Sequence, residues 1–341
     1  MTAGGLLLGV DVGGTTIAAG AVTPAGEVIL ERRLRTRERG PGHAVETIQA
    51  LIGALVAALR DDAERPGRTP AAIGLGVPGP VVAGRVGEPV PHVPELAGRA
   101  LAAELAERFG LPAFVDNDVN ALALGEWMFG AGRGARSLVV LAAGTGFGGG
   151  IVLDGRLVRG VAGFGGELGH APVKLDGRPC WCGGRGCLAV YASGRGIAES
   201  ARERVASRPD SSLRRAAGGD AAAITAPLVF RAAGEGDAVA SSVVDEACRA
   251  LGAMLATVVN GLNPDVVVIT GGVAASYAAL EPRILEAARG HAFKEALAAT
   301  RVTIVPGDKH VSMRGAAALA LYELAGRAEG LPPAAAGERR A

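Results

Sequence analysis

Two stretches of the chain follow the same plan, LLLGVDVGGTTIAAGAV at residues 6–22 and SLVVLAAGTGFGGGIVL at residues 137–153. Each consists of an apolar run, a turn rich in glycine and threonine, and a second apolar run. A tight turn between two apolar runs predicts a strand and an antiparallel return strand. The repeat indicates that both halves of the chain are built alike.

The two turns suit a phosphate group, because bare backbone amides and threonine hydroxyls can both point at an anion. Asp11, at the end of the first strand, is placed to hold a hydrated Mg²⁺ ion. A glycine hairpin without a ligand has the same pattern, but two such turns could clamp the phosphates of one nucleotide between two domains. The turn residues expected at the nucleotide are Gly13, Gly14, Thr15, Thr16, Gly144, Thr145 and Gly146.

The remaining pattern alternates strands and helices, as expected for an α/β protein. Besides the two hairpins, it predicts strands at residues 27–35, 71–77, 113–115, 266–270 and 302–305. It predicts helices at residues 43–60, 97–109, 121–128, 195–206, 238–262 and 314–324. The polar residues 208–220 read as a mobile surface excursion, and residues 326–341 as a disordered tail.

Glycines follow two of the predicted buried strands. Gly79, within Pro78-Gly79-Pro80, comes after strand 71–77, whose C-terminal end is expected to face the substrate crevice. Gly271 and Gly272 follow strand 266–270 and allow the backbone to approach a flat ligand such as adenine. A plain turn is an equal alternative at both positions.

The segment Asp116-Asn117-Asp118-Val119-Asn120 places four polar residues in five between a strand and a helix. Such a cluster is costly to bury unless water or a ligand reaches it. Capping of the helix explains Asn120 but not all four residues. A carboxylate at the mouth of a cleft can act as general base toward a substrate hydroxyl.

His170, Cys180, Cys182 and Cys187 lie within a short Gly-rich segment, residues 163–193. Three thiols and one imidazole are the ligands of a closed four-coordinate Zn²⁺ site, which would hold the loop in place rather than activate water. The alternatives are a disulfide or a chance cluster; a disulfide is disfavoured because nothing marks the chain as secreted. Cys248 lies in an Ala-rich helical pattern and is expected to be a core residue.

Composition narrows the class of protein. The chain has 341 residues, long enough for about two domains, and 49% of them are hydrophobic. A net charge of +1 with 4% aromatic residues gives no basic face with stacking rings, so we expect no nucleic-acid partner. Gly, Asp or Pro interrupt the apolar stretches before a membrane span could form, and the N-terminus shows no signal peptide. We expect a soluble cytoplasmic protein.

In order and spacing, several motifs match one family: DVGGTT, GVPGP, VDNDVNALALGE, LAAGTGFGGGIV, GELGH, CWCGGRGC and ITGG. The chain resembles the ROK family of sugar kinases and repressors, in its bacterial glucokinase-like branch. The resemblance implies a two-domain actin-like ATPase (ribonuclease H-like) fold with an interdomain cleft. The expected domains are residues 1–117, completed by a helix at 314–325, and residues 118–313, which carry the zinc loop 170–187. A homodimer is also expected.

The resemblance also assigns roles. It implies that Asp118 removes the proton from the primary hydroxyl of a sugar, and that Asn117, Glu167 and His170 bind ring hydroxyls, His170 being a zinc ligand as well. It places the adenosine beside Gly271 and Gly272. It also implies that a further group of residues surrounds the ATP phosphates and Mg²⁺. That group is Asp11, Thr15, Thr16, Thr145 and Gly146.

The chain departs from the family pattern at three places. Ala189 stands where the family has a sugar-binding Glu, residues 91–96 replace Pro-Asn-Leu and a following Trp, and Thr16 stands where Lys is common. Loss of a charged acceptor costs a ligand that needs it about 1.5–3 kcal/mol. An aminosugar or a seven-carbon cyclitol is therefore an alternative acceptor to a hexose. A repressor would need a helix-turn-helix before Leu6, and a non-catalytic sugar-binding protein would not need Asp118.

Overall fold

The computed structural model describes residues 5–61, 69–90, 92–208, 210–307 and 309–326. They form two compact units, one within Met1–Leu138, Gly150–Gly166 and Asp308–Ala341, the other within Val139–Gly149 and Glu167–Gly307. The predicted boundary between residues 117 and 118 differs from this division, because the helix that begins at Asp118 packs along the last helix of the chain, in the first unit. The predicted tail lies outside the described residues, apart from Gly326.

The first unit is built on a five-stranded sheet of order β3-β2-β1-β4-β7. The strands β1, β2 and β3 are antiparallel neighbours, whereas β4 and β7 run parallel to β1. The strands are β1 (Leu6–Val12), β2 (Thr16–Val22), β3 (Val28–Arg35), β4 (Pro70–Val77) and β7 (Ala113–Asn117), with a separate pair β5 (Val81–Val82) and β6 (Arg85–Val86).

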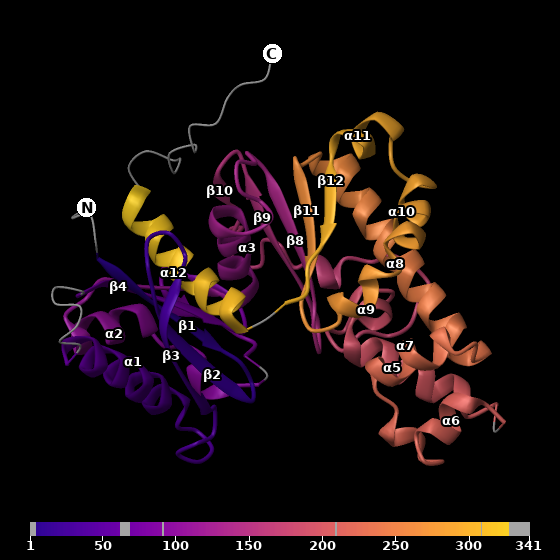
Figure 1. Cartoon of the computed structure of the whole chain (residues 1–341), viewed down its shortest axis with the longest axis horizontal. Helices are drawn as coiled ribbons and strands as arrows, with labels where there is room; N and C mark the ends of the chain where they lie inside the picture. Colours follow the sequence, from indigo (N-terminus) through magenta and orange to yellow (C-terminus); the bar gives the residue numbers. More distant parts are fainter. Residues whose placement is uncertain (1–4, 62–68, 91, 209, 308, 327–341) are drawn as a thin grey trace. The chain divides into compact units, whose positions relative to one another are not determined.

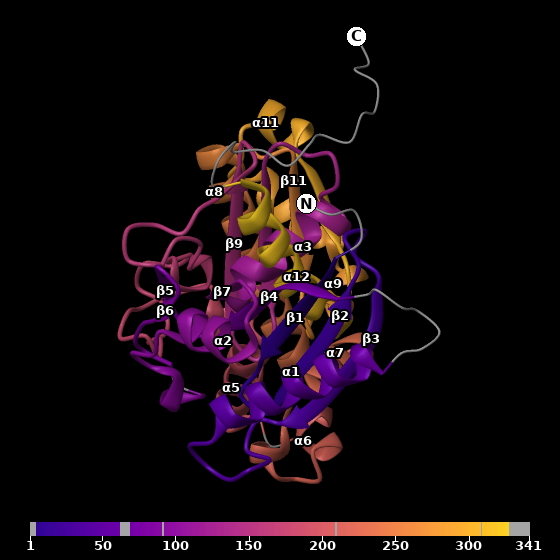
Figure 2. The ribbon, with the colours of Figure 1, turned by 90° about the vertical axis from the view of Figure 1, so that its left-hand side faces the viewer.

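Helices cover both faces of this sheet, α1 (Ala44–Arg60) and α2 (Leu101–Phe109) on one and α12 (Lys309–Gly326) on the other (Figures 1 and 2). Successive β1 side chains therefore enter different cores: Leu6 and Leu8 pack with α1, and Leu7 with α12. This explains the uninterrupted apolar run in the sequence, since a strand buried on both faces has no polar side.

Glycine lets α12 lie directly on the sheet. A Cβ on Gly9 would overlap the Met313 carbonyl oxygen, and a Cβ on Gly74 would overlap that of Ala316. The helix α3 (Asp118–Phe129) meets α12 in the same way, since a Cβ on Gly125 would lie 2.7 Å from the Gly315 Cα. Any side chain at these positions would push α12 off the sheet or off α3.

The second sheet has the order β10-β9-β8-β11-β12. Its strands are β8 (Leu138–Ala143), β9 (Phe147–Leu153), β10 (Arg156–Leu157), β11 (Val266–Thr270) and β12 (Arg301–Ile304). In both sheets the first strand is central, its two successors in the chain lie on one side, and two later strands lie on the other. The repeat predicted from the two hairpins is therefore present in the strand order.

The helices of the second unit come mainly between β10 and β12, with α8 as the longest (Figure 1). They are α4 (Ala189–Ala192), α5 (Gly194–Val205), α6 (Ser212–Ala216), α7 (Ala226–Gly234), α8 (Ala238–Leu262), α9 (Ala274–Ala278), α10 (Glu281–Arg289) and α11 (Lys294–Ala299). Among the described residues, no helix combines the length and the apolar character needed to cross a bilayer.

The segment 208–220 was predicted as a mobile excursion; its residues 211–216 contain α6 and are bound to the start of α8 by Asp237. This buried carboxylate accepts hydrogen bonds from the Ser211 and Ser212 hydroxyls, each 2.8 Å, and from the Leu213 and Ala240 amides, 3.0 and 2.8 Å. Burial alone would raise the pKa of Asp237, but these hydrogen bonds outweigh it and hold the pKa well below its usual range.

Because its pKa is depressed on folding, ionised Asp237 stabilises the native state above the pKa of an unfolded aspartate, about 3.9, and this contribution is lost as the pH falls further. We predict that Asp237→Asn lowers the free energy of unfolding at neutral pH by on the order of 1–3 kcal/mol. The difference from the wild type should shrink below about pH 4 in urea titrations. Asp220→Asn, which removes one exposed cap on Ala222, is the control and should show little effect.

Candidate functional site

The junction between β7 and α3 brings together Gly79, Asn117 and Asp118. Asn117 is the N-cap of α3: its Oδ1 accepts from the Val119 and Asn120 amides, at 2.9 and 3.2 Å, and its Nδ2 donates to the Gly79 carbonyl, at 3.2 Å. The helix therefore begins at Asp118, three residues before the predicted start, and Asn117 rather than Asn120 is its cap. The half-buried Asp118 carboxylate lies at the helix N-terminus, where the helix dipole favours negative charge.

Asp116 and Asn120 are buried structural partners, each 2% exposed. Asp116 Oδ1 accepts from the Asn117 amide at 2.8 Å and from Asn120 Nδ2 at 2.9 Å. Its Oδ2 accepts from Arg159 Nε, and Arg159 Nη2 donates to Glu323 Oε1 at 2.6 Å. Sequence reasoning missed Arg159 and Glu323, which no local pattern connects to this junction. The side chains of Asp116, Asn117 and Asn120 thus all have hydrogen-bond partners inside the protein, and Asp118 Oδ1 accepts from the Val119 amide at 2.9 Å.

The first Gly/Thr turn joins β1 to β2, and the buried residue Thr36 donates hydrogen bonds to its backbone. The Gly13 amide donates to the Thr16 carbonyl at 3.0 Å. The Thr36 hydroxyl donates to the Gly13 carbonyl at 2.6 Å, and its amide to the Thr15 carbonyl at 3.0 Å. Thr36 is buried, whereas Gly14 and Thr15 are exposed. These hydrogen bonds hold the buried side of the turn, while Gly14 and Thr15 face solvent. The sequence did not predict this supporting role of Thr36.

The second turn, Gly144–Gly146, joins β8 to β9 beside the end of β11. The Gly144 amide donates to the Gly146 carbonyl at 3.0 Å, and Thr145 and Gly146 are exposed. Gly271 has a φ of +101°, and a Cβ there would lie 2.5 Å from the Ala143 carbonyl oxygen. Gly271 therefore lies directly against Ala143, in the strand that leads into the turn, and the predicted approach of Gly271 and Gly272 to adenine stays a prediction.

The short 3₁₀ helix Leu168–His170 holds the two polar residues of the GELGH motif one turn apart. The His170 amide donates to the Glu167 carbonyl at 3.0 Å. Gly169 is required between them, because a Cβ there would overlap the Phe147 carbonyl oxygen in β9. Burial raises the pKa of Glu167, although the nearby His170 opposes this shift.

Beyond His170 the chain forms a compact loop, residues 171–188, closed by two isolated bridges. Pro172 pairs with Cys187 and Pro179 with Arg185. Gly186 has a φ of +66°, and a Cβ there would overlap the Lys174 carbonyl oxygen. The backbone can turn back toward His170 only because this position has no side chain.

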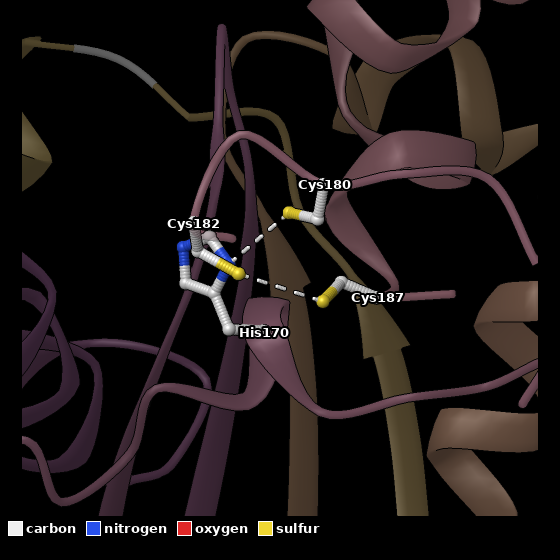
Figure 3. A group of neighbouring side chains, drawn as sticks. All are labelled: His170, Cys180, Cys182 and Cys187. Atoms are coloured by element: carbon white, nitrogen blue, oxygen red, sulfur yellow. Dashed lines mark hydrogen bonds between the residues drawn. The ribbon is translucent and has the colours of Figure 1, made fainter. Parts of the chain in front are cut away.

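The loop brings together four side chains that could hold a metal ion, those of His170, Cys180, Cys182 and Cys187, whose possible ligand atoms all lie within 4.8 Å of one another (Figure 3). The cysteines are free thiols rather than a disulfide. The Cys182 and Cys187 sulfurs are 3.8 Å apart, and His170 Nδ1 lies 3.6 Å from the Cys180 sulfur.

These separations match the edges of a coordination tetrahedron. With Zn–S bonds of about 2.3 Å and Zn–N bonds of about 2.0–2.1 Å, the S–S edge is about 3.8 Å and the N–S edge about 3.6 Å. The match assigns Nδ1 as the donor atom of His170. Two ligand separations thus match a tetrahedral site, and the four side chains would supply all four of its ligands.

The thiols differ in their acidity. Burial raises the pKa of Cys180, and it raises that of Cys187 to about 12. Burial acts in the same direction on Cys182, but hydrogen bonds outweigh it, beginning with the one from the Gly184 backbone, and the pKa of this thiol is lowered. Since thiolates bind metals, the ion must displace protons from the buried pair.

The predicted site residues fall into two sets. The first unit holds Asp11, Gly13, Gly14, Thr15, Thr16, Gly79, Asn117 and Asp118. The second unit holds Gly144, Thr145, Gly146, Glu167, His170, Cys180, Cys182, Cys187, Gly271 and Gly272. Each unit thus supplies one Gly/Thr turn.

Comparison with known proteins identifies the family of this chain. The model of the ROK family matches residues 7–323. The chain belongs to the ROK family. Its fold is the two-domain actin-like ATPase fold of that family, and its enzyme class is that of the ATP-dependent sugar kinases.

Several relatives are close over most of this ROK chain. A glucokinase of Halalkalibacterium halodurans is 40% identical over 272 residues, covering 78% of this chain and 80% of the relative. The structure of a ROK glucokinase from Streptomyces griseus, in complex with glucose and AMPPNP, is 32% identical, with a TM-score of 0.73 over 92% of this chain and 98% of that one. A ROK hexokinase from Thermus thermophilus is also 32% identical, with a TM-score of 0.75 over 94% and 99%.

The buried Asp116–Arg159–Glu323 network provides a test of what supports the β7–α3 junction. Arg159→Met would leave two carboxylates, 2% and 8% exposed, without their shared cation. We predict a loss of about 3–5 kcal/mol in the free energy of unfolding, measured by urea titration. The matched control is Arg136→Met, which removes a pair with Asp154 whose side chains are 79% and 71% exposed and should cost less than about 1 kcal/mol.

Proposed function

We propose that this ROK kinase transfers the γ-phosphoryl group of ATP to the exocyclic primary hydroxyl of a hexose or hexose-like ring, with Asp118 as the general base. The observation that carries the proposal is that the two carboxylates of the β7–α3 junction differ in burial and in their partners. Asp116 is buried against Arg159, whereas Asp118 is half-buried at the start of α3 beside Asn117. Asp118 is therefore the carboxylate of this junction suited to meet a substrate.

In the proposed reaction the Asp118 carboxylate accepts the proton of the primary hydroxyl as its oxygen attacks the γ-phosphorus. The new O–P bond forms while the bond from the γ-phosphorus to the bridging oxygen breaks, and ADP leaves with that oxygen. Phosphoryl transfer depends mainly on positioning and charge neutralisation. Asn117, Glu167 and His170 are the residues we expect to position the ring.

The nucleotide is assigned to the two Gly/Thr turns. Gly14, Thr15, Thr145 and Gly146 are exposed, and their amides and hydroxyls can donate hydrogen bonds to phosphate oxygens. Asp11, half-buried in β1, would hold Mg²⁺, which neutralises phosphate charge when bound. Gly271 and Gly272 are assigned to adenosine. The AMPPNP bound to the Streptomyces griseus relative supports a nucleotide in this fold.

We assign the metal at His170, Cys180, Cys182 and Cys187 as Zn²⁺, which prefers this ligand set and tetrahedral geometry. With four protein ligands the ion has a structural role. Coordination through Nδ1 would leave His170 Nε2 for a ring hydroxyl, so one residue can serve both the metal and the sugar.

Two classes of phosphoryl acceptor fit the proposed site, a hexose and a ring that lacks the need for one carboxylate. Glucose is supported by the glucokinases among the relatives. Ala189 is the first residue of α4, directly after the metal loop, and is buried, so it offers no side-chain acceptor where the family pattern has Glu. An aminosugar or a seven-carbon cyclitol that does not need this carboxylate is therefore the alternative acceptor.

A coupled ADP assay over glucose, mannose, glucosamine, N-acetylhexosamines, 3-amino-3-deoxyglucose and valiolone-type cyclitols tests the proposal. We expect ADP release that depends on both the acceptor and Mg²⁺. Asp118→Asn should reduce kcat by at least about 10²–10⁴-fold, because the base is lost. It should leave AMPPNP binding intact. Asp154→Asn, on an exposed turn, is the control and should be fully active. Wild-type turnover by Asp118→Asn would exclude Asp118 as the base.

Metal analysis tests the zinc assignment. Protein purified without chelator should contain about one equivalent of zinc per chain, as four ligands for one ion require. Cys180→Ser and Cys187→Ser should lose the metal and become sensitive to proteolysis within residues 171–188. Cys248→Ser, which changes the cysteine outside the cluster, should keep both metal and resistance. Zinc-free wild-type protein with an ordered loop would contradict the assignment.

A further inference from the structure

The metal loop and the turn Gly144–Gly146 are both attached to the first turn of α5. We infer that Trp181 and Arg195 are positioning residues that couple the metal loop to this turn, so that the loop governs affinity for ATP as well as for the sugar. The inference rests on the proposed function in one respect, the assignment of Gly144–Gly146 to the nucleotide phosphates.

The first link joins α5 to the turn through the backbone. The Gly194 amide donates to the Gly144 carbonyl at 2.9 Å, and the Arg195 amide donates to the Thr145 carbonyl at 3.1 Å. A Cβ on Gly194 would lie 3.1 Å from the Gly144 carbonyl oxygen, so the two segments are in direct contact. The start of α5 thus holds two consecutive carbonyls of the turn.

The second link joins the metal loop to the same residue of α5. Trp181 lies between the ligands Cys180 and Cys182, and the Arg195 guanidinium is stacked over its ring, 4.3 Å from the centroid. Arg195 Nε also donates to Glu199 Oε1 at 2.7 Å. The guanidinium is therefore held between a ring of the metal loop and a carboxylate one turn further along α5.

A third link fixes the rest of the loop to the same helix. Arg178 Nη1 donates to the Val190 carbonyl at 2.6 Å and to the Gly196 carbonyl at 3.3 Å, and Nη2 donates to Glu203 Oε1 at 2.8 Å. The first of these contacts is to α4, and the other two are to α5, at Gly196 in its first turn and at Glu203 further along. Trp181 differs from Arg178 in its position, because its partner Arg195 is itself hydrogen-bonded to the turn. Displacement of the metal loop would therefore reach Thr145 through Arg195.

A purely local role for the stacked pair makes a different prediction. Trp181 is partly exposed, and an exposed cation–π pair contributes only about 0.5–1 kcal/mol. If the pair served only the stability of the metal loop, residues 171–188, its loss would affect sugar binding, because the thiols of that loop share the proposed metal with His170, and Glu167 lies one turn before His170. An effect on the nucleotide is expected only if the contact positions the turn.

Trp181→Ala should weaken AMPPNP binding, measured by calorimetry, and raise the KM for ATP by about two- to fivefold, the factor equivalent to one exposed cation–π pair. Trp181→Phe retains a ring under the guanidinium and should restore most of the affinity. Leu175→Ala is the matched control, since Leu175 is in the same loop and 82% exposed, and it should change neither value.

Removal of the metal is a second test of the inference. Wild-type protein stripped with a chelator should lose AMPPNP affinity at least as much as Trp181→Ala does, and stripping Trp181→Ala should then add little. Unchanged AMPPNP affinity in Trp181→Ala that is folded and retains its metal would overturn the inference, as would an effect confined to the KM of the sugar. AMPPNP binding needs no turnover. If Trp181→Ala weakens it while the wild type phosphorylates no acceptor, the coupling stands and the proposed reaction fails.

Discussion

One guanidinium, that of Arg159, holds together the part of the first unit that carries the proposed base. Arg159 lies between the carboxylates of Asp116 and Glu323, so it joins the end of β7 to the last turns of α12. Asp116 in turn binds the Asn117 amide and the Asn120 side chain. Leaving a buried carboxylate without its cation is costly, so these contacts fix the backbone that carries Asn117 and Asp118.

The second unit meets the same need for rigidity in another way. Residues 171–188 contain little regular structure and few apolar side chains that could form a core. Their order comes from four converging ligands, two isolated bridges and the contacts of Arg178 and Trp181 with α4 and α5. In both units, polar groups with satisfied partners hold the residues assigned to the substrate, whereas the apolar cores hold the sheets.

Much of the fold was readable in the sequence because its signals are local. The apolar runs predicted strands within a few residues of their observed ends, and α8 and β11 were predicted with their observed bounds. The spacing of the four metal ligands indicated a single site, since they lie within 18 residues. The start of α3 was misplaced because Asn117, the last residue of a strand, caps the helix that follows it.

The sequence by itself determined the repeated strand plan and the two Gly/Thr turns, and it predicted the four candidate metal ligands; Asp118 was predicted as the base from the family resemblance. These features depend on neighbouring residues, whose spacing fixes their chemistry. Only the tertiary structure showed that Asp116 and Asn120 are structural, that Thr36 supports the first turn, and that Arg195 joins the second turn to Trp181. Such pairs are made between segments far apart in the chain, and no periodicity records which distant residue satisfies a buried polar group.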